Sequence, residues 1–388
     1  MEPFPSPAVV PFRVDVPDAA IDDLKRRLAA TRWPEAETVG DWSQGVPLAK
    51  LQELVAHWRD RHDWRAFEAR LNGFPQFRTE VDGCGIHFLH VRSPHEGALP
   101  LLLTHGWPGS VVEFLDSIGP LTDPTRHGGT AGDAFHLVIP SLPGFGWSDK
   151  PTAPGWNVPR IARAWAALMG RLGYDRWVAQ GGDWGGHITA ELGRQRPSGL
   201  AAIHVNYPLV FPDPLPTHGL TYEERRAVDG KKSYDEHSSG YKKEQSTRPQ
   251  SLGYGLADSP AGQAAWIYEK FWEWTDNTGA PESALPVTAM LDNIALYWFT
   301  NTAASSARIY WENERHKPAT GAIELPVGVS IFPREIFRAP RTWAEQTYQQ
   351  LIHWNELDRG GHFAAFEEPD LFVAELRACF RSLRSAIR

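Results

Sequence analysis

Residues 177–186 read WVAQGGDWGG, an apolar run that leads into two glycines, one carboxylate, a tryptophan and two more glycines. An amphipathic stretch follows, so the order predicts a strand, a sharp turn and a helix, with Asp183 at the turn. Gly181 and Gly185 stand two residues before and two after Asp183. We expect glycine at both positions because the strand and the helix nearly touch there, and a Cβ atom would clash. This arrangement presents the Asp183 side chain as a nucleophile.

A carboxylate at this turn predicts a chemistry different from that of the serine found in esterases and peptidases. It needs no deprotonation before it attacks, and its product is an alkyl ester that water can cleave. Asp183 therefore favours displacement at a saturated carbon, as in an epoxide or an alkyl halide. The alternative interpretation is that Asp183 only caps a helix, where aspartate is also favoured. Glycine-rich turns also occur in nucleotide-binding folds, but the sequence contains no GxGxxG or Walker motif.

The composition is that of a globular protein, since 42% of the 388 residues are apolar and 22% are charged. The 17 tryptophans are an excess that suits a large cavity lined by aromatic side chains. A net charge of −8 and the lack of a basic run argue against nucleic acid as a partner.

The cysteines and the apolar runs indicate the environment of the protein. Cys84 and Cys379 are too far apart in sequence to suggest a disulfide framework or a metal site. Residues 1–5 lack the basic and apolar regions of a signal peptide. The longest apolar runs fall far below the length of a membrane span. We therefore expect a cytoplasmic enzyme with no membrane partner and no bound metal.

The order of strand and helix signals predicts the fold class. Residues 1–75 read as three helices, the first capped by Asp18, with no convincing strand, and we interpret them as a cover. Between 76 and 206, a hairpin and then buried strands alternate with helices, one of them at 111–121. This alternation predicts an α/β protein with a mostly parallel, doubly wound sheet. Its ligand site should lie beyond the carboxyl ends of the strands.

Residues 207–321 interrupt the alternation and read as an inserted helical lid, which we call the lid segment. It begins with a proline-rich stretch and includes two aromatic-rich helical runs, at 261–275 and 288–303. The alternation resumes over 322–388. There the pattern predicts a strand at 325–331, a helix at 344–351, a strand at 353–357 and a terminal helix at 369–387.

The partners of the nucleophile follow from chain order, which runs nucleophile, acid, histidine in this kind of sheet. His362 stands just after the last predicted strand, behind two glycines that form a loop. Glu335 follows the strand at 325–331 and is the predicted acid. Asp358 is nearer in sequence, but it lies in the turn that leads to His362 and has less freedom to face the far ring nitrogen.

A different interpretation of Glu335 is a surface residue paired with Arg334 or Arg338.

Hydrolysis of an ester also requires amide donors for the developing negative charge. The backbone N–H groups of Trp107 and Trp184 are the candidates, one after an earlier strand and one directly after the nucleophile.

Opening an epoxide requires a proton donor as well, and a neutral tyrosine of the lid segment fits that role because its pKa is about 10. Composition alone does not choose among the candidates, which are Tyr222, Tyr234, Tyr241, Tyr254, Tyr268, Tyr297 and Tyr310.

Four stretches resemble the microsomal-type epoxide hydrolases of the α/β-hydrolase fold. They are GGDWG at the predicted turn, HGWPGS at 105–110, RGGHFAAFEEP at 359–369, and the N-terminal stretch at 11–34. The resemblance covers nearly the whole chain. It implies that Asp183 is the nucleophile, His362 the base and Glu335 the acid.

The same resemblance implies two proton donors in the lid segment. Tyr241 lies in GYKKEQSTRPQ at 240–250, and Tyr310 lies in RIYWEN at 308–313, each similar to a family motif. The family uses no cofactor, and its substrates are epoxides that react with water. Bacterial relatives include detoxifying enzymes and enzymes of antibiotic pathways that open aryl or styrene-type epoxides, and similar proteins are often homodimers, so the resemblance implies a role and an assembly of these kinds. The N-terminal membrane anchor of animal members is not seen in this sequence.

Two other functions remain open at this point. In a haloalkane dehalogenase, Trp184 would hold the halide through its indole N–H, but the two lid tyrosines would have no role. A catalytically silent binding protein of the same fold is the non-enzyme alternative, although all the expected catalytic residues are present.

Overall fold

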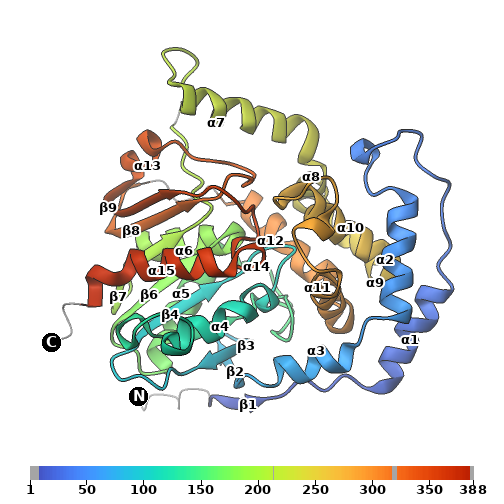
Figure 1. Cartoon of the computed structure of the whole chain (residues 1–388), viewed down its shortest axis with the longest axis horizontal. Coiled ribbons are helices and arrows are strands. Elements are labelled where there is room, and N and C mark those ends of the chain that lie inside the picture. The colour runs from blue at the N-terminus through green and yellow to red at the C-terminus, as the bar shows by residue number, and fades with distance from the viewer. Residues whose placement is uncertain (1–7, 213, 317–320, 385–388) are drawn as a thin grey trace.

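The computed structural model describes residues 8–212, 214–316 and 321–384, which form one nine-stranded sheet with helices around it (Figure 1). The strand order is β1-β2-β3-β5-β4-β6-β7-β8-β9. Neighbours from β5 to β9 are parallel, whereas β1, β2, β3 and β5 pair antiparallel in that order. The prediction of an α/β protein with a mostly parallel sheet is confirmed. The strands are β1 (Val10–Phe12), β2 (Gln76–Val81), β3 (Cys84–Val91), β4 (Leu99–Thr104), β5 (Phe135–Pro140), β6 (Trp177–Gly181), β7 (Leu200–Val205), β8 (Ile323–Ile331) and β9 (Tyr348–Glu356).

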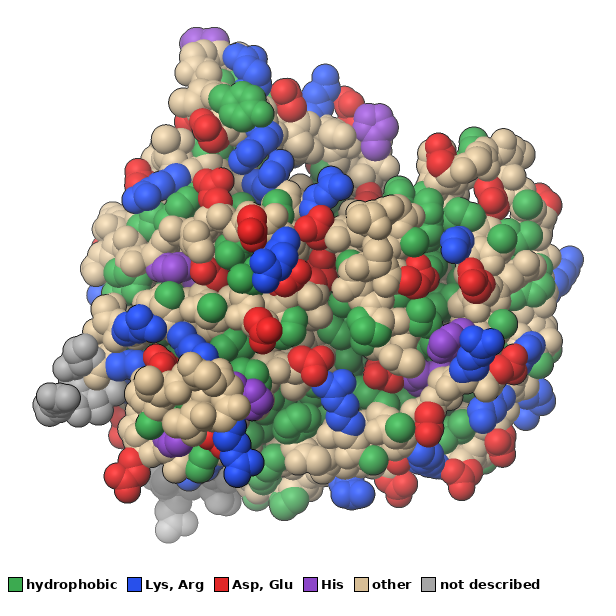
Figure 2. Space-filling model, in the orientation of Figure 1, with side chains coloured by type: hydrophobic (Ala, Val, Ile, Leu, Met, Phe, Trp, Pro, Cys, Tyr) green, Lys and Arg blue, Asp and Glu red, His purple; other side chains and the backbone are tan. Residues whose placement is uncertain are grey.

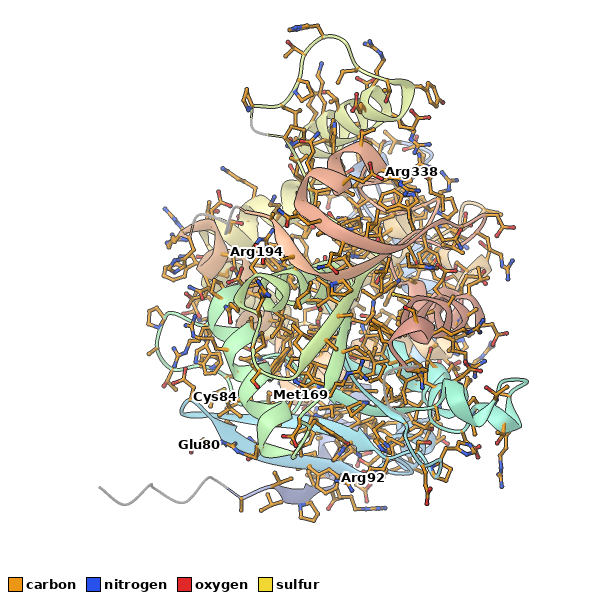
Figure 3. All side chains as sticks on the ribbon, turned by 90° about the vertical axis from the view of Figure 1, so that its left-hand side faces the viewer. Glu80, Cys84, Arg92, Met169, Arg194 and Arg338 are labelled. Carbon is orange, nitrogen blue, oxygen red and sulfur yellow. The ribbon has the colours of Figure 1, made fainter. Side chains whose placement is uncertain are left out.

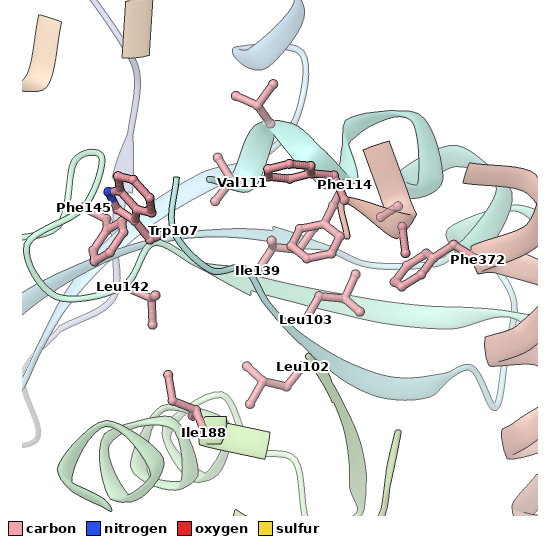
Figure 4. Close-up of a cluster of buried hydrophobic side chains, with 14 of the residues drawn as sticks. Leu102, Leu103, Trp107, Val111, Phe114, Ile139, Leu142, Phe145, Ile188 and Phe372 are labelled. Carbon is pink, nitrogen blue, oxygen red and sulfur yellow. The ribbon is translucent and has the colours of Figure 1, made fainter. Parts of the chain in front are cut away.

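Helices cover both faces of the sheet. On one face lie α5 (Val158–Arg171) and α6 (Asp183–Gln195), which carry the labelled residues Met169 and Arg194 in Figure 3. On the other lie α4 (Leu115–Thr122) and α15 (Pro369–Arg384). Figure 4 shows the consequence for β4, where Leu102 points toward Ile188 and Leu103 toward Phe114 and Phe372. A strand buried on both faces needs apolar residues without alternation, which explains its run of leucines.

Most helices of the N-terminal and lid segments lie at one side of the sheet (Figure 1). In the N-terminal segment they are α1 (Asp18–Ala29), α2 (Leu48–Asp60) and α3 (Trp64–Leu71). In the lid segment they are α7 (Tyr222–Ser233), the π-helical turn η5 (Tyr234–Ser238), α8 (Gly240–Thr247), α9 (Pro249–Asp258), α10 (Pro260–Trp274), α11 (Val287–Thr300) and α12 (Ala303–Glu314). The remaining short helices are α13 (Arg341–Thr347), α14 (Ala364–Glu367) and the 3-10 turns η1 (Trp42–Gln44), η2 (Val111–Phe114), η3 (Pro124–Arg126), η4 (Ala131–Asp133) and η6 (Pro281–Ser283). Helix α7, by contrast, extends above α13 at the top of the view (Figure 1).

The N-terminal segment contacts both the sheet and the lid segment. At the sheet, β1 pairs with β2. At the lid segment, Arg27 donates a hydrogen bond of 3.0 Å to the carbonyl of Asp258, and His62 Nε2 lies 2.8 Å from Asp292 Oδ1. The ring of Trp42 also stacks on Trp272 with centroids 4.8 Å apart. The segment therefore fixes the position of the lid helices relative to the sheet.

The expectation that residues 1–75 contain no strand was wrong, because Val10–Phe12 forms the edge strand β1. Three residues are too few for a period of two to be visible, and Pro11 argues against a strand except at an edge. The predicted cap was also wrong. Pro17 stands at the N-cap, and Asp18 is the first helical residue and pairs with Arg65.

Two further boundaries differ from the predicted ones. The last strand begins at Tyr348, where the sequence predicted a helix to 351, because the helix α13 ends at Thr347. The predicted helix at 111–121 starts with the 3-10 turn η2 before α4. Helix α15 is described to Arg384, so the last residues predicted for it lie outside the described residues, as does the 1–5 stretch that lacks signal-peptide features.

The surface shown in Figure 2 carries acidic and basic side chains interspersed over the sheet, the lid segment and the N-terminal helices. Within the part of the chain that the structure describes, no helix is both long and apolar enough to span a bilayer.

Candidate active site

Asp183 lies at the junction of β6 and α6 with a backbone φ of +49°. Such a left-handed conformation is uncommon for a residue with a side chain and is held by its surroundings. A Cβ atom on Gly181 would lie 2.1 Å from the carbonyl oxygen of Gly185, and one on Gly185 would lie 1.9 Å from that of Thr104. Only glycine fits at either place. Gly182, not Asp183, stands at the helix N-cap, so the helix-cap interpretation of Asp183 was wrong.

Backbone amides hold the Asp183 carboxylate. The amide of Trp107, in the loop after β4, donates a hydrogen bond of 2.8 Å to Asp183 Oδ1. This approach requires Gly106, because a Cβ atom there would lie 2.2 Å from the same oxygen. The amide of Trp184 is a second group that favours the ionised carboxylate. The structure thus places both predicted amide donors at the nucleophile.

His362 and Glu335 complete a line of three charged side chains. Nδ1 of His362 lies 2.5 Å from Oε1 of Glu335, and Nε2 lies 3.3 Å from Oδ2 of Asp183. The imidazole ring and the Glu335 side chain are buried. Glu335 Oε1 also accepts a hydrogen bond of 2.8 Å from the amide of Ile336, which fixes its orientation.

The loops that carry these two residues follow β8 and β9 and are joined to each other. The amide of Arg334 donates to the carbonyl of Gly360 at 3.1 Å, and the amide of His362 donates to the carbonyl of Trp274 at 2.9 Å. The end of α10 in the lid segment therefore holds the backbone of His362. Asp358, the competing acid, is 85% exposed and lies beside Arg359. Arg334 pairs with Asp276, not with Glu335.

The electrostatics of the site favour an imidazolium between two carboxylates. Burial alone would lower the pKa of His362, but the charges of Glu335 and Asp183 outweigh it and raise that pKa well above its ordinary value. Burial likewise opposes ionisation of Asp183. Its pKa is nevertheless lowered, because the hydrogen bond and charge of His362 and the two amides outweigh the burial.

Tyr241 and Tyr310 lie on α8 and α12, near enough to Asp183 to be affected by its charge. Both are buried, and their ring centroids lie 5.8 Å apart. Tyr241 stacks on Trp107 at 5.1 Å, and Tyr310 meets Trp184 edge to face at 4.8 Å. Burial raises the pKa of both hydroxyls well above the ordinary value, so both keep their protons near neutral pH.

Of the five other candidate tyrosines, four lie elsewhere. Tyr268 bonds to Glu282, Tyr297 donates to the carbonyl of Gly109 at 2.7 Å, and Tyr222 and Tyr254 are exposed. The exception is Tyr234, whose hydroxyl contacts that of Tyr241. The two tyrosines that the family motifs indicated are thus buried beside each other and beside Trp107 and Trp184.

Comparison with known proteins identifies the family. A model described as "Epoxide hydrolase N terminus" matches residues 9–114, and one for the alpha/beta hydrolase fold matches residues 100–231. Epoxide hydrolase 1 of Sus scrofa is 35% identical over 95% of this chain and 88% of its own length. The chain belongs to the epoxide hydrolase family. A Stigmatella aurantiaca protein named for a proposed epoxide hydrolase activity is 67% identical over 97% of this chain and 86% of its own length.

Solved structures of the family share the fold. Juvenile hormone epoxide hydrolase of Bombyx mori matches with a TM-score of 0.89 and 28% identity, over 98% of this chain and 96% of that one. The Aspergillus niger epoxide hydrolase matches with a TM-score of 0.86 and 32% identity, over 97% and 96%. The expected α/β-hydrolase fold is thus confirmed, and the chain is an enzyme of the epoxide hydrolase type.

Sequence analysis missed several residues of the site in this family member. Trp274 and Tyr207 place their rings 5.1 and 5.2 Å from the His362 ring. Glu113 lines a cavity of about 20 Å³ together with Asp183 and His362. Burial raises its pKa to about 8. No sequence signal marks Glu113, because a single glutamate in a predicted amphipathic helix reads as a surface residue.

Among the described residues, no group of three or more His, Cys, Asp and Glu side chains is arranged to hold a metal ion. The cavity beside Glu113 has room for about one water molecule.

Proposed function

We propose that the enzyme converts a hydrophobic epoxide to a vicinal diol through an ester on Asp183. The observation that carries this proposal is the position of the Asp183 carboxylate. It lies 2.8 Å from the amide of Trp107 and 3.3 Å from the ring nitrogen of His362. Two buried tyrosines contact the rings of Trp107 and Trp184, the residues whose amides face Asp183, and a proton donor for the epoxide oxygen is required near this place.

In the first step, a carboxylate oxygen of Asp183 attacks one ring carbon of the epoxide. The new carbon–oxygen bond forms as the ring carbon–oxygen bond breaks, and the departing oxygen takes a proton from Tyr241 or Tyr310. Their raised pKa values keep a proton available until the alkoxide develops.

In the second step, water attacks the ester carbonyl while His362 accepts a proton from that water. Once the ester forms, Asp183 no longer carries the charge that helped to hold a proton on His362, so the imidazole can become neutral. The amides of Trp107 and Trp184 hold the carbonyl oxygen while it is negative. Collapse breaks the bond between the carbonyl carbon and the diol oxygen. The departing alkoxide takes a proton from His362, which regains one from the newly formed carboxyl group, so the diol is released and the Asp183 carboxylate is restored.

The substrate class follows from the walls of the site. Trp107, Trp184, Trp274 and the two tyrosines present aromatic rings around the nucleophile. Such walls favour a flat, apolar group beside the epoxide, and we propose aryl or styrene-type epoxides.

A single turnover in ¹⁸O-water with enzyme in excess tests the covalent route. The first diol should carry an oxygen from Asp183 and no label, and the label should appear in the Asp183 carboxylate by mass spectrometry of the peptide. Label in the first diol would show direct attack of water on the epoxide and overturn the proposal.

We also propose that the chain is divided into four parts. These are the N-terminal segment 1–75, the first core part 76–206, the lid segment 207–321 and the second core part 322–388. The division is supported by the placement of α7 to α12 between β7 and β8. The strand β1 adds a few residues of the first part to the sheet of the core.

A further inference from the structure

Tyr234 is the one lid tyrosine outside the assigned pair that contacts it. Its hydroxyl lies 2.8 Å from that of Tyr241, and either oxygen can be the donor. Tyr234 opens the π-helical turn η5, which joins α7 to α8. Turns of this kind are rare and are frequent at functional sites, because the extra residue redirects a side chain. Here the turn directs Tyr234 toward the buried hydroxyl of Tyr241.

The three neighbouring tyrosines, Tyr310, Tyr241 and Tyr234, differ in solvent exposure. Tyr310 and Tyr241 are 4% and 6% exposed, whereas Tyr234 is only partly buried. The buried face of Tyr241 is enclosed by Trp107 and Trp274, with Lys270 Nζ 4.6 Å from its ring centroid. Tyr234 is thus the hydrogen-bonded partner of Tyr241 and is less deeply buried than Tyr241 itself.

The proposed reaction creates a need for such a connection. Each opening of an epoxide by Tyr241 leaves a phenolate, which must regain a proton before the next turnover. A phenol hydroxyl can donate one proton and accept another at the same oxygen. We propose that Tyr234 relays the replacement proton from solvent to Tyr241.

The protons balance over one cycle. Tyr241 gives a proton to the alkoxide, and the Tyr234 hydroxyl passes its own proton to the phenolate while taking one from a water molecule. His362 loses one proton before it accepts another from the hydrolytic water, so one proton leaves and one enters. The relay depends on the proposed function. Tyr234 acts only through Tyr241 and does not touch the substrate.

The variant Tyr234→Phe tests the relay, because it keeps the ring and removes the hydroxyl. Tyr241 starts each experiment protonated, so ester formation in the first turnover should stay within about twofold of the native rate. Later turnovers should slow by about tenfold. They should show a larger solvent deuterium effect, and added small buffer acids should restore the rate. Phenolate absorbance should rise after the first turnover. Tyr254→Phe, at an exposed lid position, is the matched control and should change none of these.

A structural role of the hydroxyl would give a different pattern. It would slow the first turnover as much as later ones, with no phenolate signal and no rescue by buffer acids, and that result overturns the relay. In a Tyr241→Phe background there is no Tyr241 phenolate for Tyr234 to reprotonate, so Tyr234→Phe should have no added effect. An equal loss there also overturns the relay. If Tyr241→Phe leaves the first turnover unchanged, the proposed donor role itself fails, which separates the two failures.

Discussion

The carboxylate of Glu335 lies 2.5 Å from Nδ1 of His362, and the opposite ring nitrogen faces Asp183 at 3.3 Å. One imidazole is therefore held between two carboxylates. Only one of them, Asp183, would lose its charge when an ester forms. The protonation of His362 is thereby linked to whether the nucleophile is free or alkylated.

Replacing His362 by Gln should trap the ester. Asp183 keeps its position and the Trp107 amide, so alkylation continues, but no base activates the water. Intact mass spectrometry after mixing with styrene oxide should show one added substrate mass per chain. The double variant Asp183→Asn, His362→Gln is the control and should gain no mass. An adduct on the double variant would mean that another side chain is alkylated.

Replacing Glu335 by Gln should slow ester hydrolysis more than ester formation. The Glu335 carboxylate lies 2.5 Å from the imidazole, and its charge stabilises the protonated ring. Without that charge, the pKa of His362 falls and the imidazolium that forms during hydrolysis is less stable. We expect a reduction of roughly 10²-fold to 10⁴-fold in the second step, measured by rapid mixing under single-turnover conditions. Glu335→Asp should recover part of the rate. Equal slowing of both steps would argue against this role.

Removing either lid hydroxyl should slow the first step. We expect Tyr241→Phe and Tyr310→Phe each to reduce ester formation by roughly 10²-fold, and the double variant to be slower than either. The quenching of tryptophan fluorescence on ester formation provides the signal, since Trp107 and Trp184 contact the two tyrosines. Tyr222→Phe, at an exposed position, is the control. A double variant as fast as the native enzyme would require another proton donor.

Glu113 should make the protein less stable as the pH rises. Burial raises its pKa from 4.5 to about 8, so between these values the unfolded chain loses a proton that the folded chain keeps. The free energy of unfolding should therefore fall with increasing pH over this range, by at most about 5 kcal/mol at 1.4 kcal/mol per pKa unit.

The variant Glu113→Gln, which resembles the neutral acid in shape, should remove this decline. Urea unfolding should show the variant equal to the native protein near pH 4 and more stable near pH 8. Glu80→Gln, at an exposed position, is the control and should behave like the native protein at both. Parallel stability curves for native and Glu113→Gln protein across the range would refute the raised pKa.

Adding a methyl group at Gly185 should disrupt the turn that carries the nucleophile. The new Cβ would lie 1.9 Å from the backbone oxygen of Thr104, and neither backbone can move away. We expect Gly185→Ala to lose more than about 3 kcal/mol of stability. Gly170→Ala, in α5 with open space around the Cβ position, should instead gain about 0.5–1 kcal/mol. Thermal unfolding of both variants provides the comparison.

The features that sequence predicted well are those fixed by local chemistry. The glycines around Asp183 indicate a close backbone contact that no other residue permits. The leucines of β4 indicate a strand that is buried on both faces. These two signals give the turn and the sheet. The chain order of nucleophile, acid and histidine then indicates Glu335 and His362, which the structure places together.

The features that sequence did not predict depend on distant contacts. The strand β1 exists only because β2 lies beside it, and its three residues carry no pattern of their own. Composition did not choose Tyr241 and Tyr310 among the seven candidate tyrosines, and only the family motifs indicated them, because their place depends on how α8 and α12 bring them to Trp107 and Trp184. Glu113 is recognisable only by the cavity that it shares with the nucleophile.

The contacts of the N-terminal segment also constrain how a substrate reaches the nucleophile. The lid helices stand between β7 and β8 in the chain, and a rotation of these helices away from the sheet as one block would open the site. The bonds from Arg27 and His62 to the lid segment, together with the β1–β2 pairing, oppose that rotation. Entry and exit should therefore proceed through a passage opened by turning a few side chains. Its width, rather than any large domain movement, would then set the upper size limit of the epoxides admitted.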